Sequence, residues 1–229
     1  MARKARLIIP GVPLHVMVKG LPNLAIFPND ESKLTYLAWL RDAAREYQLA
    51  IHAYVLLPTQ LNLLVTPKST ESLSRTMQSL GRRYTQYFNQ HHQKEGSIWA
   101  GRYKSSIVDP QNYLLNCQKF IELMPVVEGL VTKPEDYLWS SYRIHVGKEP
   151  NYGLTDAPSF WNLGNTPFER QMNWKHFIDE GLTAKETEVI THSISSQGIT
   201  GTSDFLTSAS TKVLTYVAPK RRGRPKKVQ

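Results

Sequence analysis

Two polar side chains, Gln60 and Asn62, stand two residues apart inside an otherwise apolar stretch. The stretch reads as a strand, and in a strand residues two apart point to the same face. Leu61, Leu63 and Val65 then point the other way, towards a core. The paired amides could offer neutral carbonyl oxygens to a metal ion, although only weakly. The alternative is an ordinary solvated strand face.

The sequence around this pair, AYVLLPTQLNLLVTP, resembles the signature strand of the single-tyrosine HUH transposases, including the REP-associated ones. The resemblance implies a strand with two histidines around one apolar residue. It also implies that their imidazoles hold Mg²⁺ or Mn²⁺, which polarises the scissile phosphate of single-stranded DNA. Gln60 and Asn62 stand at those two positions here. We therefore expect no metal site and no cofactor, or at most weak metal binding.

A second departure lies in the segment FIELMP, residues 120–125. The resemblance implies Tyr-Ile-Glu-Leu-Asn-Pro, in which the tyrosine forms a covalent 5′-phosphotyrosine link to DNA. The asparagine four residues on faces the same side of the helix and is a polar partner of the metal site. Phe120 has no hydroxyl for nucleophilic attack, and the Met124 thioether is a poor ligand for a hard cation. With Gln60 and Asn62, these departures predict loss of cleavage with retention of the fold, and so no catalytic residue.

One substitute nucleophile is conceivable. Tyr113 lies seven residues before Phe120 in the same expected helix, which puts it roughly 10 Å from the implied nucleophile position. That distance is too long for in-line attack at the same phosphate, so we expect Tyr113 to pack against the protein. Glu122 is a lone acid, for which a salt bridge or a helix cap is expected.

The order of elements predicts an α+β, ferredoxin-like split βαβ sheet with an added helix. Apolar periodicity and turn signals place strands at 14–19, 54–57, 61–65 and 101–108. Helices are expected at 31–48, with apolar positions Leu34, Leu37, Leu40 and Ala44, at 71–91, interrupted by Gly81, and from about 110 to 124, ended by Pro125. An antiparallel sheet with helices on one face would leave its other face free for nucleic acid. The third helix would lie across or beside that sheet.

We expect three segments in the chain. The resemblance implies a transposase-like domain over residues 1–147, and composition predicts a helical region over residues 148–216 and a basic tail over residues 217–229. Within the helical region, short helices are expected near 166–181, 183–197 and 202–214. The tail contains the Gly-Arg-Pro core of an AT-hook, in which an extended arginine-proline segment enters the narrow minor groove of A·T-rich DNA. A non-specific polybasic tail is the alternative.

Basic and aromatic residues alternate in LGRRYTQYF (80–88) and recur in GRYKSS (101–106). Guanidinium groups can bind phosphates while rings stack on bases, which suits single-stranded nucleic acid. An amphipathic helix with its rings in the core is the alternative for the first segment. The candidate DNA-binding residues are Arg82, Arg83, Tyr84, Tyr87, Arg102, Lys104, Arg221, Arg222, Arg224, Lys226 and Lys227.

Bulk properties agree with a DNA-binding protein of the cytoplasm. The formal net charge is +9 over 229 residues. Six of the positive charges fall in the last ten residues, which contain no acid, so the tail carries most of the attraction for polyanions. The single cysteine excludes an internal disulfide and suits a reducing cytosol. No apolar run is long enough for a membrane span or a signal peptide.

These observations favour a DNA-binding protein derived from a single-tyrosine transposase that no longer cleaves DNA. Its partner would be hairpin or palindromic single-stranded DNA, A·T-rich duplex, or both, and we expect it at the nucleoid. Two alternatives stay open. One is an active transposase that uses displaced residues, and the other is an inactive domain that serves dimerisation or a protein partner.

Overall fold

Five strands form one sheet in the computed structural model, which describes residues 7–217. They are β1 (Leu14–Lys19), β2 (Leu49–Leu57), β3 (Gln60–Pro67), β4 (Lys104–Val108) and β5 (Ile199–Thr200). The order is β2-β3-β1-β4-β5, with antiparallel pairing among the first four strands and β5 parallel to β4. The first four strands have the ferredoxin-like order, so the predicted fold class is confirmed. The sequence does not predict β5, because two residues carry no recognisable period.

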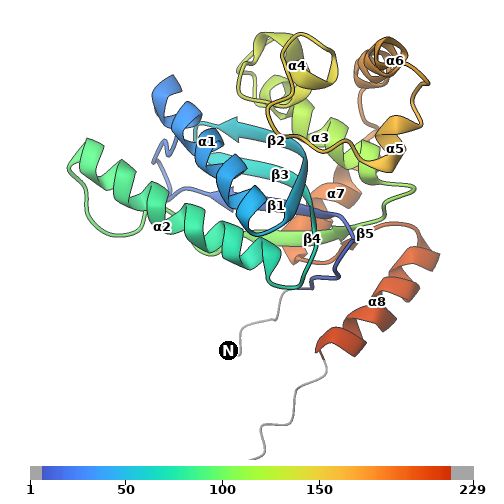
Figure 1. The fold of residues 1–229 in the computed structure, drawn as a ribbon, viewed down its shortest axis with the longest axis horizontal. Coiled ribbons are helices and arrows are strands. Elements are labelled where there is room, and N and C mark those ends of the chain that lie inside the picture. Colours follow the sequence, from blue (N-terminus) through green and yellow to red (C-terminus); the bar gives the residue numbers. More distant parts are fainter. Residues whose placement is uncertain (1–6, 218–229) are drawn as a thin grey trace, which may run out of the picture.

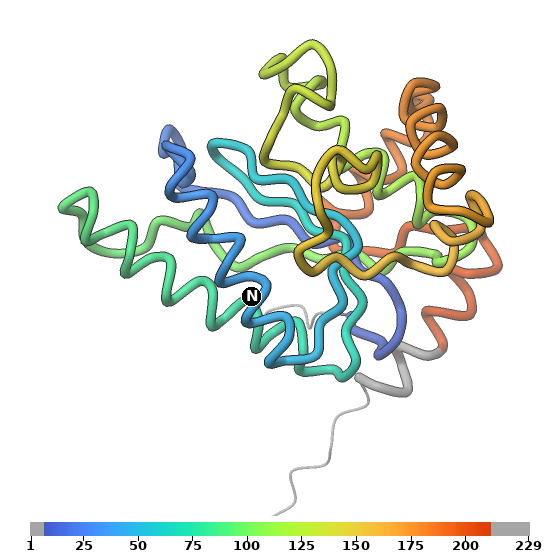
Figure 2. Tube along the Cα trace, turned by 45° about the horizontal axis from the view of Figure 1, so that its top comes forward, coloured from blue at the N-terminus to red at the C-terminus, as the bar shows by residue number. Residues whose placement is uncertain are grey.

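Helices cover both faces of the sheet (Figure 1). The longer helices are α1 (Asp30–Glu46), α2 (Ser72–His92), α3 (Leu114–Val127), α6 (Pro167–Asp179), α7 (Ala184–Ser196) and α8 (Ser203–Val217). The short ones are η1 (Pro134–Asp136), α4 (Tyr142–His145) and α5 (Pro158–Trp161). α1 packs against α2 on one face, while α3 contacts β2 and β3 and α7 contacts β4 on the other. Figure 2 shows the segment from η1 to α6 at one end of the molecule, away from α2.

α1 begins at a capping box. The Asn29 side chain accepts a hydrogen bond from the Ser32 N–H (2.9 Å), and the Ser32 hydroxyl accepts one from the Asn29 N–H. Tyr36 and Leu40 are buried on the face that meets the sheet. The prediction that Leu34 shares this face is wrong, because Leu34 is 60% exposed at the flank of the helix.

α2 is one continuous helix, so the interruption predicted at Gly81 is wrong. Leu80, Tyr84 and Phe88 recur at helical spacing and are buried along one side. Glycine costs about 1 kcal/mol in a helix interior relative to alanine, and the burial of these large side chains offsets that cost. The Gly81 carbonyl oxygen also accepts a hydrogen bond from the Thr85 hydroxyl (2.7 Å).

α3 starts later than the sequence predicts. The Asp109 carboxylate accepts hydrogen bonds from the backbone N–H groups of Gln111 (3.0 Å) and Asn112 (3.2 Å). These bonds hold a turn ahead of the helix rather than its first residues. Tyr113 is therefore the residue that precedes the helix, which begins at Leu114.

α3 also ends later, and the prediction that Pro125 terminates it is wrong. Proline lacks the N–H that would bind the carbonyl four residues earlier, which removes one helical hydrogen bond. The next turn is intact, because the Glu128 N–H donates to the Met124 carbonyl oxygen (2.9 Å). The helix runs to Val127 and closes at Gly129, whose φ of 70° lies in the left-handed region.

β3 divides its side chains between two cores. Leu61, Leu63 and Val65 join the core beneath α1 and α2, as predicted, while Gln60 and Asn62 point to the opposite face. That opposite face is not free for nucleic acid, which corrects the prediction. α3 and α7 cover it, because apolar side chains also point that way. They include Ala53, Val55 and Leu57 of β2 and Leu64 of β3, all fully buried.

The region after residue 147 contributes to the same sheet. It supplies β5, which extends the sheet at β4, and α7, which covers β4. The three helices predicted near 166–181, 183–197 and 202–214 correspond to α6, α7 and α8. The division of the chain at residues 147 and 216 stays a prediction. Within residues 7–217, none of the helices combines the length and apolarity needed to cross a membrane.

Candidate nucleic-acid interface

A cavity of about 380 Å³ opens on the side of the sheet that carries α3 and α7. Gln60 and Asn62 line it from β3, and Phe120 and Met124 line it from α3. Residues of β1, of α7 and of the loop before β4 complete the lining. The structure thus brings together all four positions that the resemblance marks as the catalytic site.

A hydrogen bond between His15 and Asn62 organises the floor of this cavity. His15 Nε2 lies 3.0 Å from Asn62 Oδ1, and since that oxygen only accepts, Nε2 carries the proton. Burial lowers the pKa of His15 to about 4, although the bond to Asn62 acts in the other direction. The His15 ring is therefore neutral near pH 7. Phe120 packs edge-on against it, with ring centroids 5.9 Å apart.

Two polar atoms at the floor are buried without a partner. They are His15 Nδ1 and Asn62 Nδ2, in side chains that are 0% and 1% exposed respectively. Gln60 differs, because its Nε2 donates to the carboxylate of Glu128 (2.5 Å). The Gln60 amide donor at the floor is therefore paired, whereas the Asn62 amide donor lacks an acceptor and His15 Nδ1 lacks a donor.

Two of the predicted DNA contacts lie at this cavity. Arg102 and Lys104 line it from the loop before β4 and from the start of β4. The Lys104 ammonium donates to the Ser195 carbonyl oxygen of α7 (3.2 Å), while Arg102 is exposed. These two cations give the mouth of the cavity a positive potential suited to phosphate.

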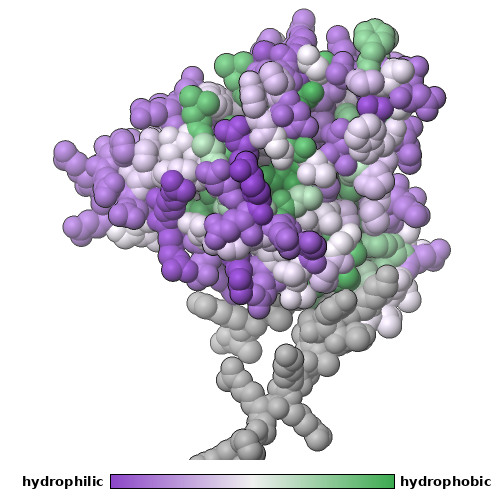
Figure 3. All heavy atoms as spheres, viewed as in Figure 1, coloured by the Kyte–Doolittle hydropathy of each residue, from purple (hydrophilic) through white to green (hydrophobic). Residues whose placement is uncertain are grey.

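The predicted contacts on α2 lie on the other side of the sheet. Figure 3 shows this side of the molecule, on which hydrophilic side chains cover most of the surface. Arg82 and Arg83 are exposed, and the Arg83 guanidinium lies 4.0 Å from the ring centre of Trp39. Tyr87 is half-buried and stacks on Tyr84 (5.7 Å between centroids).

Tyr84 cannot serve as a stacking surface for bases in this structure, which corrects the prediction. Its side chain is 0% exposed, and its hydroxyl donates to the Ile26 carbonyl oxygen (2.6 Å). The amphipathic pattern of α2 places this ring in the core. Tyr113, the proposed substitute nucleophile, packs among apolar residues beside α3 and does not line the cavity. Arg221, Arg222, Arg224, Lys226 and Lys227 lie outside the described residues.

Sequence reasoning missed His15, which lines the cavity, and Glu128, which accepts a hydrogen bond from Gln60. His15 had a usable signal, because strict alternation in β1 puts it and Met17 on the face opposite Leu14 and Val16. Antiparallel pairing then sets Met17 against Asn62, and His15 two pairs further along, against Leu64. Nothing in the sequence pointed to Glu128, because its position depends on how far α3 continues beyond Pro125.

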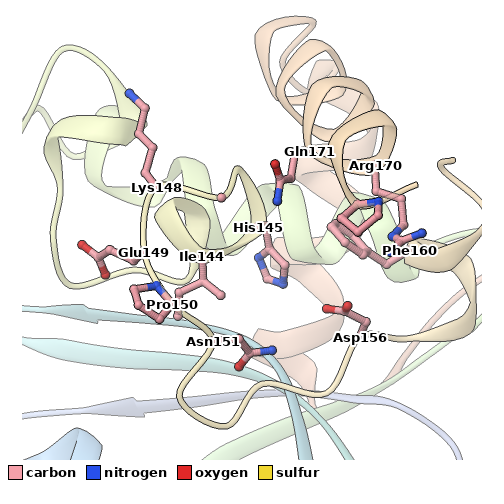
Figure 4. A pocket seen from close by; sticks show the side chains of 12 residues that line it. Ile144, His145, Lys148, Glu149, Pro150, Asn151, Asp156, Phe160, Arg170 and Gln171 are labelled. Atoms are coloured by element: carbon pink, nitrogen blue, oxygen red, sulfur yellow. The ribbon is translucent and has the colours of Figure 1, made fainter. Parts of the chain in front are cut away.

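A second polar cluster lies on another flank of α3 and was also missed. Glu122 is fully buried and accepts hydrogen bonds from Ser141 Oγ (2.5 Å), His145 Nδ1 (2.6 Å) and Trp174 Nε1 (2.9 Å). The acid is thus paired rather than alone. His145 in turn lines a separate cavity of about 500 Å³. Figure 4 shows Asn151 and Asp156 on the chain that passes beside His145.

Comparison with known proteins agrees with this geometry. Residues 15–123 match the model of the family described as "Transposase IS200 like". Those residues contain β1 apart from its first residue, β2 to β4, and the part of α3 that bears Phe120. This part of the chain is similar to the IS200-like transposases. No curated protein matches the sequence.

One solved structure has the same fold as this chain. A REP-associated tyrosine transposase bound to a REP hairpin superposes with a TM-score of 0.55 at 18% identity, covering 68% of this chain and 94% of that one. A protein of Deinococcus radiodurans R1, provisionally assigned as a transposase, has a TM-score of 0.38 at 21% identity and covers 53% of this chain and 96% of its own. The first of these likenesses supports the fold assignment.

Proposed function

We propose that this protein is a DNA-binding member of the IS200-like transposase family that does not cleave DNA. One observation carries the proposal: the four side chains at the family's catalytic position line a single cavity that also bears Arg102 and Lys104. Phe120 offers no hydroxyl, so the covalent step has no nucleophile there. The cations remain, and phosphate contacts need no more than positive charge and hydrogen-bond donors.

The proposed DNA has two forms, each with its own contacts. Hairpin or other single-stranded DNA would bind at the cavity, as a REP hairpin is bound by the structurally similar transposase. A·T-rich duplex would be bound by the basic tail, residues 217–229, through its Arg-Gly-Arg-Pro segment. Such a protein would act at the nucleoid in the cytoplasm.

Fluorescence anisotropy over a salt series tests this proposal with two matched double variants. Arg102→Ala with Lys104→Ala removes two charges at the cavity, and Arg82→Ala with Arg83→Ala removes two from α2. The first pair should weaken hairpin binding more than the second, although the net charge changes equally. Removal of one cation that binds a phosphate should flatten the slope of log K against log salt by about 0.7 to 0.9.

The tail is tested in the same assay. Deletion of residues 218–229 should weaken binding to A·T-rich duplex strongly and lower its salt slope by several units, because up to six cations are removed. Hairpin binding should change less. If the full chain binds neither probe more tightly than about 10 µM at low salt, a value within the range of non-specific affinity, the DNA-binding proposal is wrong.

Cleavage is tested with labelled hairpin DNA and Mg²⁺. We expect no covalent adduct, and we expect at least the four changes Gln60→His, Asn62→His, Phe120→Tyr and Met124→Asn together to be needed before any appears. An adduct that disappears on Tyr113→Phe would instead establish an active transposase with a displaced nucleophile.

A protein-interaction role is the second candidate, favoured by an apolar groove of about 360 Å³ between α1 and residues 138–154. Leu34 and Leu138 line it and are 60% and 50% exposed. If this role is correct, neither the double variant at the cavity nor the double variant on α2 should alter DNA binding. The anisotropy series therefore separates it from the first proposal.

A further inference from the structure

The floor of the cavity does not fit the divalent metal that the family resemblance implies. A metal needs lone pairs directed at it. The Asn62 oxygen is taken by the His15 N–H, and Gln60 turns its Nε2 towards Glu128 as a donor. Within residues 7–217, no group of three His, Cys, Asp or Glu side chains is placed to hold a metal ion. His15 Nδ1 is a single lone pair at the floor, and the other groups described there are N–H donors, so the floor offers no set of ligands for a metal ion.

The unpartnered donor at the floor indicates what kind of group it would accept. His15 Nε2–H holds the Asn62 oxygen at 3.0 Å, and this bond fixes which way the amide points. Asn62 Nδ2 is consequently left buried without an acceptor. A buried donor without a partner has lost its hydrogen bonds to water and gained none in the protein. A ligand with acceptor-only oxygens would supply the missing acceptor.

The neighbouring amide already binds such a group. Gln60 Nε2 donates to a carboxylate oxygen of Glu128 at 2.5 Å. A carboxylate, like a phosphodiester, is an anion whose oxygens only accept hydrogen bonds. Glu128 follows α3 at an exposed position, so it can withdraw without disturbing the core. Arg102 and Lys104 add positive charge beside the two amides.

We infer that the cavity is a metal-independent phosphate site. The side-chain amides of Asn62 and Gln60 would donate to the two free oxygens of one phosphodiester, with His15 as the residue that orients Asn62. Glu128 is then a competing anion that occupies the Gln60 donor until phosphate displaces it. This inference rests on the proposed DNA binding and deepens it, since it names the ligand group, the donors and an internal competitor.

Side-chain amide NMR signals of Gln60 and Asn62, assigned with Gln60→Glu and Asn62→Asp, report the interaction directly. Hairpin DNA and inorganic phosphate are titrated separately, each in the presence of EDTA. Shifts of both signals with the hairpin alone identify a DNA backbone phosphate as the ligand, and shifts with both titrants identify a site for phosphate in general. If neither titrant moves the Asn62 signal, the inference is wrong; the proposed function still stands if anisotropy shows that the hairpin binds.

Affinity for the hairpin provides the second measurement. Asn62→Asp replaces a donor by an anion and should weaken binding about tenfold or more, because a hydrogen bond to a charged group is removed and repulsion is added. Glu128→Gln should strengthen binding, whereas Glu188→Gln, an exposed change of equal charge on α7, should have a smaller effect. A hairpin affinity that depends on Mn²⁺ and is abolished by EDTA, or an equal effect of the Glu128 and Glu188 variants, would overturn the inference.

Discussion

Two polar clusters flank α3, and they differ in how completely their atoms are paired. On one flank, Glu122 receives three hydrogen bonds, from Ser141, His145 and Trp174. On the other, His15 and Asn62 share one hydrogen bond and leave two buried atoms unpaired. Residues 120 and 124 share one side of a helix, and residue 122 lies nearly opposite to them. α3 therefore separates a cluster in which Glu122 accepts three hydrogen bonds from one in which two buried polar atoms have no partner.

The difference teaches how to read buried polar groups in this protein. A fully paired buried cluster contributes to a single well-defined packing of the core. In this case it links α3 to α4 and α6, which come from a distant part of the sequence. An unpaired buried donor costs free energy and makes no such contribution. We therefore expect the first cluster to support the fold, and we propose that the second binds a ligand.

The largest effect should come from the satisfied cluster. Glu122→Gln keeps the volume of the side chain but replaces one acceptor oxygen by a donor, so at least one of the three incoming N–H and O–H groups loses its partner. We expect the free energy of unfolding to fall by about 3–5 kcal/mol, the range for breaking a buried pair. Chemical denaturation measures it. Glu188→Gln, an exposed control, should change it by less than about 0.5 kcal/mol, and a similar small change at Glu122 would remove the distinction between the clusters.

A smaller effect should come from the pH dependence of the unsatisfied cluster. Burial lowers the pKa of His15 from 6.5 to about 4 in the folded protein. Above pH 6.5 the ring is neutral in both states and makes no difference. As the pH falls below 6.5, only the unfolded chain takes up the proton, so folding becomes less favourable. At about pH 4.5 this amounts to about 2–3 kcal/mol.

Denaturation of the wild type and of His15→Gln at about pH 7.5 and 4.5 measures the part of the stability loss that is due to His15. Glutamine can still donate to the Asn62 oxygen but does not titrate. The variant should lose less stability than the wild type between the two pH values. An equal loss in both proteins would mean that the acid sensitivity comes from other groups.

Much of the fold could be predicted because its signals are local. β1 has the bounds predicted from its alternation, and the order of the first seven elements is confirmed. The opposite orientations of Leu61 and Asn62 follow from the two-residue period of a strand alone. Gathering Gln60, Asn62, Phe120 and Met124 into one cavity required the family pattern as well, because nothing local connects β3 to α3.

What could not be predicted depends on interactions across long stretches of sequence. Glu122 meets Ser141, His145 and Trp174, which lie 19, 23 and 52 residues away, and no period or motif links them. The covered second face had a signal that was not used. β2 is apolar apart from His52 and Tyr54, and β3 has three apolar residues in a row at 63–65, which is typical of strands buried on both sides.

The smallest effect should come from removing the unsatisfied pair as a unit. Asn62→Leu alone leaves the His15 Nε2–H buried without an acceptor, at a cost of about 1–3 kcal/mol. Adding His15→Phe removes that donor and both unpaired atoms together, with side chains of similar shape. The double variant should therefore unfold within about 1 kcal/mol of the wild type at neutral pH, since losing both partners of a buried hydrogen bond is nearly neutral.

A double-mutant cycle measures this recovery as the coupling between the two positions. Hairpin binding should respond differently from stability. The double variant should be nearly as stable as the wild type but should bind the hairpin more weakly, because the Asn62 donor is gone. A double variant that is several kcal/mol less stable would show that His15 and Asn62 support the fold as Glu122 does. In that case pairing is not what distinguishes the two flanks of α3.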